Sequence, residues 1–507
     1  MNLVVRDAFW QILGRFISAL AWFMVVKLIT PYFGPLRYGD YSTILKYFAI
    51  WSALADFGVY VVALNRLGKI KDKVKQELMY HKFLWVRFVM VAVVYGIAFL
   101  AAYLIPAYSG NPFIVWGLLF GMIFSALFMS AGIIQIPLQL NWKMKDVSIA
   151  LIRARVVQIS ILCLWIFVLF TDVDFSTSSK YTIWAFLFVL FSVLASGLAQ
   201  FIYVLYKGGK FLKFKIDFDL TFIKNIIKTN WRYGFSYYLS SFHTLIVLIM
   251  FSIYYPTADG WTFVGTWALA LALIEILLII PSALWNSMIH KISDSTMLEK
   301  RKSFGFFMSF IVWIGLAVMY NFTFFSTDII QIIAGSDYLT TASQIWSDFI
   351  LPFLSFVLFL SFIKQVFNYL FVSTDNQNYL FNINLVGVII GTIAGLYLIP
   401  IYNIKWGIIT QVLLEILFVL GALFIAYRKK VLPIIKYKFI WLFSLIFTVL
   451  TLISWQFDLI WNMKNMLSNI SLTGNYYIFN LIIIIFSVNL VYILVSWPYL
   501  KKVLKSL

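Results

Sequence analysis

The sequence predicts an all-α integral membrane protein of about fourteen transmembrane helices. Of its 507 residues, 63% are hydrophobic and only 12% are charged, whereas soluble domains are apolar at roughly half of their positions. Apolar stretches of about 20 residues, the length that crosses a bilayer, recur along the chain. Basic residues gather in alternate loops between these stretches, which is typical of multi-pass membrane proteins.

The predicted spans follow one another through short connections. They cover residues 8–30, 41–64, 83–105, 113–137, 149–170, 182–206, 231–254, 261–285, 303–325, 349–372, 380–399, 405–427, 438–457 and 476–498. The first run continues past Lys27 without a short apolar core followed by a small-residue cleavage signal. We therefore expect it to be a retained span rather than a signal peptide.

The positions of Lys and Arg predict the orientation. The basic segments are residues 66–75, 143–145, 207–228, 291–302, 428–438 and 501–505. The intervening loops hold little more than Arg37, Lys180, Lys405 and Lys464. Because basic loops stay on the cytoplasmic side, both termini are predicted to be cytoplasmic, which requires an even number of spans. This pattern indicates a location in the cell (cytoplasmic) membrane.

The order of the spans predicts two repeated bundles. Residues 1–206 would form one six-helix bundle and residues 230–430 a second, followed by two additional helices in 431–507. An even-numbered unit repeats in parallel, so the bundles would be related by a pseudo-twofold axis along the membrane normal. A faint sequence echo supports this, since Gly39-Asp40-Tyr41 and Gly265-Thr266-Trp267 lie near the starts of corresponding spans.

The predicted connection between the bundles is a cytoplasmic elbow at residues 207–229, in which charged and apolar residues alternate. The elbow is either an interfacial connector or a docking site for a cytoplasmic partner.

Four segments resemble the polysaccharide flippases of the multidrug/oligosaccharidyl-lipid/polysaccharide (MOP) exporter superfamily. They are ITPYFGPLRYGDY at 29–41, Asp56-Phe57-Gly58-Val59 with Asn65-Arg66, IAGSDY at 333–338, and LIPIYN at 398–403 with Trp406-Gly407. The resemblance implies a flippase that moves a lipid-linked oligosaccharide of the undecaprenyl-pyrophosphate type from the cytoplasmic to the exterior leaflet. Alternating access would arise from rocking of the two bundles, in the service of surface polysaccharide biosynthesis.

Ionisable residues within spans usually face a protein interior or an aqueous cavity, because facing lipid is costly. The candidates for binding the substrate are Arg15, Lys27, Lys46, Arg87, Arg153, Lys364, Gln365 and Asn368. Arg15 is the foremost of these, since a guanidinium binds phosphate oxygens bidentately and stays charged. Snorkelling at the interface is the alternative for Arg15, Lys27 and Lys46. Arg87, Arg153 and Arg155 either bind substrate or anchor the cytoplasmic ends of their helices.

Four further residues are candidates for coupling transport to H⁺ or Na⁺: Glu275, Glu415, Asp56 and His243. Burial raises the pKa of a carboxyl group and an ion or a base relieves that strain, so a deep acid can alternate between states. The alternatives are a structural pair with a lysine or hydroxyl for the two glutamates, a pair with Arg66 or a helix terminus for Asp56, and a packed, hydrogen-bonded His243.

Several classes of function are excluded by composition and motifs. The net charge of +19 does not indicate nucleic-acid binding, because the basic residues lie in short loops rather than on one face. A single cysteine, Cys163, permits no intrachain disulfide and no thiolate metal site. The chain contains no P-loop or His-Glu-x-x-His motif, so we expect no enzyme, cofactor or metal.

Two alternatives to the flippase remain open. One is a cation-coupled multidrug exporter of the same superfamily, which would have few basic residues in its cavity. The other is a membrane glycosyltransferase or polymerase, although no large exterior loop is predicted. Membrane lipids and a glycosyltransferase or polymerase are the expected partners of a flippase.

Overall fold

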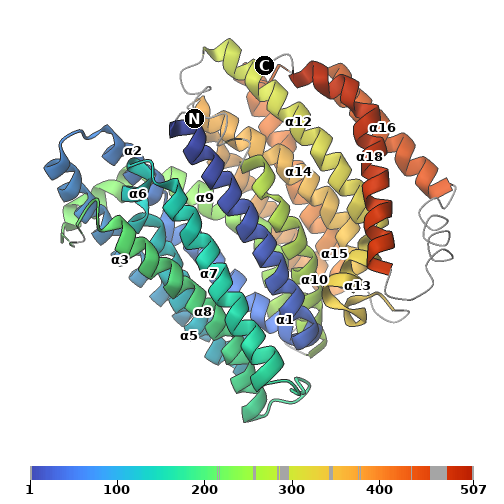
Figure 1. Ribbon diagram of the computed structural model, residues 1–507, viewed down its shortest axis with the longest axis horizontal. Helices are drawn as coiled ribbons and strands as arrows, with labels where there is room; N and C mark the ends of the chain where they lie inside the picture. The colour runs from blue at the N-terminus through green and yellow to red at the C-terminus, as the bar shows by residue number, and fades with distance from the viewer. Residues whose placement is uncertain are drawn as a thin grey trace. The chain divides into compact units, whose positions relative to one another are not determined.

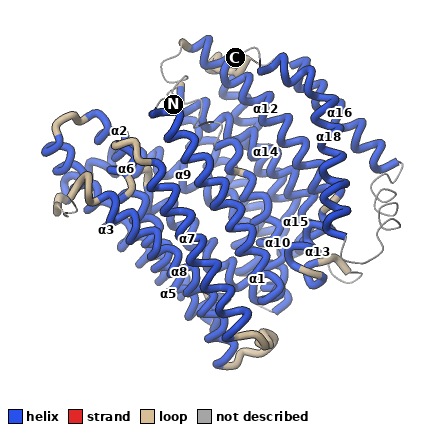
Figure 2. Tube along the Cα trace, viewed as in Figure 1, coloured by secondary structure: helices blue, strands red, loops and turns tan. Residues whose placement is uncertain are grey.

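The computed structural model describes residues 3–213, 215, 217–254, 258–282, 285, 296–341, 346–374, 376, 378–434, 437–456 and 477–504 (Figure 1). Within these ranges every regular element is helical, as Figure 2 shows. The all-α class predicted from composition is therefore confirmed for the described part of the chain.

The number of spans is lower than expected. Among the described residues, 11 helices are long and apolar enough to cross a membrane, or 12 if the bent pair Gly234–His243 and Leu245–Tyr254 forms one span. Fourteen spans are thus not confirmed. One reason is that the stretch Phe9–Asp56 counts once, although two spans are predicted within it. Another is that, of the predicted span 438–457, only the shorter apolar helix Trp441–Leu452 meets the apolar criterion.

Close contacts divide the chain into two compact units. Unit 1 comprises Met1–Leu269 and Asn384–Gly407, and unit 2 comprises Ala270–Ile383 and Ile408–Leu507. These units are defined by contact and do not test an internal repeat. The domain boundaries at residues 206, 229 and 430 therefore stay predictions.

Unit 1 is built around four long helices that pack on one another. Its elements are α1 (Leu3–Asp56), α2 (Val59–Lys69), α3 (Lys73–Tyr103), α4 (Pro106–Ser109), α5 (Pro112–Ile134), α6 (Ile136–Leu140), α7 (Met144–Leu164), the π-helix η1 (Trp165–Leu169), α8 (Lys180–Gly208) and α9 (Leu220–Tyr254). It also holds the first part of α10 (Ala258–Leu277) and the middle of α15 (Asn378–Arg428). Helix α1 packs along α7, α5 along α8, and α7 along α8 (Figure 1).

Helix α1 consists of two arms that meet at Gly34, whose backbone is not helical (φ 62°, ψ 174°). Pro31 and Pro35 flank this point, and proline removes a backbone donor and crowds the preceding turn. The arms correspond to the predicted spans 8–30 and 41–64. The second span ends earlier than predicted, because Phe57 and Gly58 both have positive φ (44° and 72°) and stop the helix before α2 begins.

Two glycines allow α1 and α10 to approach closely. A Cβ atom on Gly39 would collide with the carbonyl oxygen of Trp261, and one on Gly265 would collide with that of Pro35. Only a residue without a side chain fits such a close backbone approach. The predicted motif glycine Gly39 therefore has a packing role that its sequence context alone does not reveal.

Unit 2 contains α12 (Met297–Phe324), α13 (Ser326–Ala334), the 3₁₀-helix η2 (Ser336–Tyr338), α14 (Ser347–Ser373), α16 (Tyr437–Gln456) and α18 (Tyr477–Leu504), with the remaining parts of α10 and α15. Helix α12 packs against α14, α16 and α18. The indole of Trp313 donates to Ser496 Oγ (2.8 Å), and Asn321 and Asn489 exchange side-chain hydrogen bonds of 2.9 Å. Polar groups buried among apolar helices need such partners, so these bonds specify where α18 lies on α12.

Candidate functional site

The cationic side chain of Arg155 lies where α7 packs against α1 in unit 1. Its Nη1 atom donates to Gln158 Oε1 at 2.7 Å, and its guanidinium lies 4.9 Å from the ring centre of Trp22 on α1. The residue is half-buried, and Gln158 is fully buried. No carboxylate lies within ion-pair distance of Arg155 among the described residues. A neutral amide and an aromatic face orient the guanidinium without cancelling its charge.

Arg15, the foremost candidate from the sequence, is half-buried on the first arm of α1. Its charge is close enough to interact electrostatically with the Tyr60 hydroxyl of α2. That hydroxyl donates to Gln139 Oε1 at 2.7 Å. In the part of the chain that the structure describes, Arg15 forms no ion pair, so its charge is also not neutralised.

Arg87, a candidate for substrate binding, and Asp56, a candidate for ion coupling, form an ion pair. Arg87 is 1% exposed, and its guanidinium bonds the Asp56 carboxylate through Nη2. Its Nη1 atom lies 3.4 Å from the carbonyl oxygen of Ala55. The predicted partner of Asp56 was Arg66 or a helix terminus, and the structure pairs it instead with Arg87 of α3. The pair joins the end of α1 to α3, where the chain turns at Phe57.

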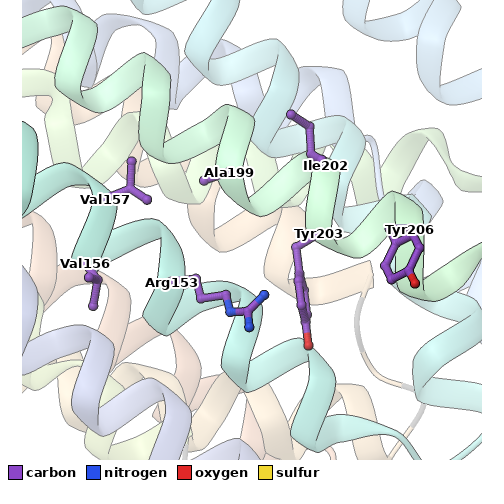
Figure 3. Close-up of a pocket in the computed structure, with 7 residues that line it drawn as sticks. All are labelled: Arg153, Val156, Val157, Ala199, Ile202, Tyr203 and Tyr206. Atoms are coloured by element: carbon purple, nitrogen blue, oxygen red, sulfur yellow. The ribbon is translucent and has the colours of Figure 1, made fainter.

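The remaining predicted cations of unit 1 lie on α1 and α7 and differ in burial. Lys27 is exposed on α1, and Lys46 is half-buried on the second arm of that helix. Arg153 is exposed on α7, with its guanidinium 4.6 Å from the ring centre of Tyr203 on α8 (Figure 3). Positions two apart on a helix point to nearly opposite sides, so Arg153 and Arg155 serve different faces of α7.

In unit 2 the structure brings together Lys364 of α14 and Glu415 of α15. The Nζ atom lies 3.1 Å from Glu415 Oε1, and the two residues are 5% and 0% exposed. The ammonium also lies 5.1 Å from the ring centre of Phe418. This contact is one of the alternatives given above for Glu415, a pair with a lysine. Because both groups are buried, each charge depends on the other.

Several buried amide atoms near this pair in sequence have no hydrogen-bond partner among the described residues. They are Gln365 Oε1 and both side-chain polar atoms of Gln411, which precedes Glu415 by one helical turn. Buried polar groups are normally satisfied, so these atoms point to water or an ion that enters this part of unit 2. Asn368, the last residue of the predicted polar stripe, is half-buried.

Two other predicted coupling residues lie on α9 and α10. His243 is fully buried on α9, where its ring faces the backbone of Gly387 in α15. Glu275 is half-buried near the end of α10. Within the described ranges, no three His, Cys, Asp or Glu residues are grouped as a metal site would require.

One buried polar network was missed by the sequence reasoning. Asp40 accepts from Arg37 Nη1 (3.0 Å) and from Asn111 Nδ2 (2.7 Å), while Arg37 Nε donates to the carbonyl oxygen of Phe175 (3.0 Å). Asp40 is fully buried. The available signal was the spacing of an acid three residues after an arginine in the short connection between the first two predicted spans. The network connects α1 to α5 and to the loop before α8, which indicates a structural role.

Comparison with solved structures identifies the class of fold. The structure resembles "Lipid II flippase MurJ, inward closed conformation", with a TM-score of 0.70 and 14% identity over 98% of this chain and 100% of that one. It also resembles a MOP superfamily transporter from Pyrococcus furiosus (TM-score 0.55, 12% identity, 85% and 95% coverage). An inward-facing multidrug resistance MATE transporter matches with a TM-score of 0.52 and 12% identity over 82% and 96%. The chain is thus a multi-pass membrane protein with the fold of MOP superfamily transporters.

Sequence comparison defines the family. Residues 4–290 match the family described as "Polysaccharide biosynthesis protein", and the chain belongs to that family. The resemblance inferred from the four motifs is therefore confirmed. No curated protein matches the chain in sequence.

Proposed function

We propose that this protein is a flippase that carries a polyprenyl-pyrophosphate-linked oligosaccharide from the cytoplasmic to the exterior leaflet by alternating access. Two findings support a link to lipid-linked glycans. The chain belongs to a polysaccharide biosynthesis family, and its fold is that of a lipid II flippase. The substrate's prenyl chain would stay in the bilayer while the protein binds the charged and sugar parts.

The observation that carries this proposal is the pair of arginines whose charges no carboxylate neutralises in the described ranges. Arg15 and Arg155 both lie in unit 1, on α1 and on the face of α7 that meets α1. A diphosphate offers several anionic oxygens, and guanidinium groups bind such oxygens with paired, charge-assisted hydrogen bonds. Arg155 is already oriented by Gln158 and Trp22, so little side-chain freedom would be lost on binding.

Ion coupling is assigned in this proposal to Glu415. When Glu415 is ionised, it holds the Lys364 ammonium. A proton or Na⁺ that reaches the carboxylate would weaken this hold and let the ammonium turn toward another anion. Uptake and release of the ion would then alter unit 2 in step with transport.

The second candidate is the cation-coupled multidrug exporter, favoured by the complete burial of Glu415 within a membrane helix. A cationic drug would, however, be repelled by Arg15 and Arg155. A membrane glycosyltransferase or polymerase has no support from the fold, which is that of transporters.

Reconstituted vesicles would test the proposal directly. A polyprenyl-diphosphate glycan with a fluorescent sugar is placed in the outer leaflet, and movement is followed by quenching. Vesicles with the protein should move the lipid, and Arg155→Ala should slow movement by about tenfold or more, because charged hydrogen bonds are lost. Arg155→Lys should keep part of the rate.

Arg428→Ala is the matched control, because Arg428 also stacks on an aromatic ring, that of Phe424, at 5.0 Å. It should leave the rate unchanged. Vesicles that export a cationic dye but move no glycan lipid would instead establish the exporter.

A further inference from the structure

A groove on unit 1 lies between α7 and α8. Like a phospholipid, it combines a charged part with an apolar part. We call it the α7–α8 groove. Its volume is about 460 Å³, within the range of about 300–1,000 Å³ typical of small-molecule sites. Figure 3 shows Arg153 between the valines of α7 and the Tyr203 ring of α8, with Tyr206 farther along α8. Val156, Val157, Ala199 and Ile202 supply the apolar remainder.

The groove faces outward from helices that span the membrane. Val156 is 56% exposed and Ile202 is 60% exposed, and both belong to candidate spans, Met144–Leu169 and Lys180–Gly208. Apolar side chains that remain exposed on such helices face lipid chains rather than water. The occupant of the groove is therefore a molecule that already surrounds the protein in the bilayer.

The polar end of the groove carries a positive charge. Arg153 contacts the Tyr203 ring at 4.6 Å, and no carboxylate lies within ion-pair distance of Arg153 among the described residues. The nearby Asp146 accepts a hydrogen bond from the Tyr203 hydroxyl (3.1 Å), and its charge is balanced by Lys207 Nζ at 3.6 Å. The guanidinium thus remains available to an anion.

The polar end of the groove lies toward the predicted cytoplasmic side of the membrane, and its apolar end lies deeper. Arg153 precedes Val156 and Val157 along α7, while Tyr203 and Tyr206 follow Ala199 and Ile202 along α8. The charged and aromatic end therefore lies toward the basic segments 143–145 and 207–210, which are predicted to be cytoplasmic. Aromatic and basic residues gather at headgroup level, and apolar residues lie deeper.

We propose that the α7–α8 groove binds an anionic phospholipid of the cytoplasmic leaflet, with its phosphate on Arg153 and an acyl chain along Val156, Val157 and Ala199. This site is separate from the proposed transport site, since Arg153 and Arg155 serve different faces of α7. It makes Arg153 a lipid-binding residue instead of a substrate-binding one.

Lipid titration followed by native mass spectrometry tests the proposal. The full chain, stripped of lipid in detergent, is titrated with phosphatidylglycerol or phosphatidylcholine of the same acyl chains. The wild type should bind phosphatidylglycerol about tenfold more tightly, as expected for a charged hydrogen bond. Arg153→Ala should abolish this preference, and Arg153→Lys should keep part of it.

Two further variants locate the effect. Ala199→Trp fills the apolar end and should weaken binding of both lipids, whereas Arg428→Ala removes a ring-stacked arginine elsewhere and should change neither. A preference that survives Arg153→Ala would overturn the proposal. So would displacement of phosphatidylglycerol by undecaprenyl phosphate at a tenth of its concentration, because the groove would then belong to a prenyl lipid.

Discussion

Gly39 of α1 and Gly265 of α10 pack against each other in a reciprocal contact. A side chain on either glycine would strike the carbonyl oxygen four residues before the other, at Trp261 or Pro35. A contact in which each partner makes the same interaction with the other is what a local two-fold axis produces. The two glycines are also those of the faint sequence echo. The internal repeat itself stays a prediction.

Substitution of either glycine should destabilise the protein. Gly39→Ala or Gly265→Ala places a methyl group against a backbone carbonyl that cannot move without shifting a helix. We expect each to cost about 1–3 kcal/mol of unfolding free energy, as overpacked sites do. Denaturant unfolding in detergent measures this loss.

Gly96→Ala is the matched control, because Gly96 is also helical and a Cβ atom there meets nothing within 4 Å. It should be neutral or stabilising by up to about 1 kcal/mol, since alanine favours the helix. Equal effects of Gly39→Ala and Gly96→Ala would show that the close approach of α1 and α10 is absent.

Removing only one partner of the Lys364–Glu415 pair should destabilise the protein. Lys364→Met leaves the Glu415 carboxylate buried without its cation, and the expected loss is about 3–5 kcal/mol. The double variant Lys364→Met with Glu415→Leu removes both charges and should recover most of that stability. Thermal unfolding of the three proteins provides the comparison, and a double variant as unstable as the single would contradict a direct pair.

Arg87 should behave as a structural residue. Because it is buried against Asp56, Arg87→Met should lower the unfolding free energy by about 3 kcal/mol. Surface glycan should fall only in proportion to the amount of folded protein in the membrane. Loss of glycan at a normal protein level and stability would instead place Arg87 in the substrate site.

Arg15 should act in transport without supporting the fold. Arg15→Ala should abolish glycan display in cells that depend on this protein, while the membrane level stays normal. The reason is that its half-buried guanidinium has no carboxylate partner among the described residues, so its removal leaves no unpaired charge. Display is measured by surface labelling. Lys27→Ala, an exposed cation on the same helix, serves as control, and unchanged display in Arg15→Ala would remove Arg15 from the site.

The sequence was informative where a single helix determines the answer. Apolar length and basic loops predicted a multi-pass helical protein with separate spans at 8–30 and 41–64. The motif around Gly34 and Gly39 was one of the four segments that predicted the family. These signals are local, because the bilayer imposes the same length and polarity on every span. The count of fourteen was not confirmed. The second span was predicted to end too late, since hydropathy does not register the stop at Phe57 and Gly58.

The roles of the charged residues depended on contacts between helices far apart in sequence. Hydropathy identified Arg87, Asp56, Lys364 and Glu415 as unusual, but their pairing required α1 to meet α3 and α14 to meet α15. Likewise, the sequence does not distinguish Arg153 from Arg155. Only the packing of α7 between α1 and α8 gives the two arginines different neighbours. The free-energy cost of burying a charge depends on its surroundings rather than on the residue type. The sequence therefore determined which charges enter the membrane, and the folded helices determined which of them have no carboxylate partner in the described part of the chain.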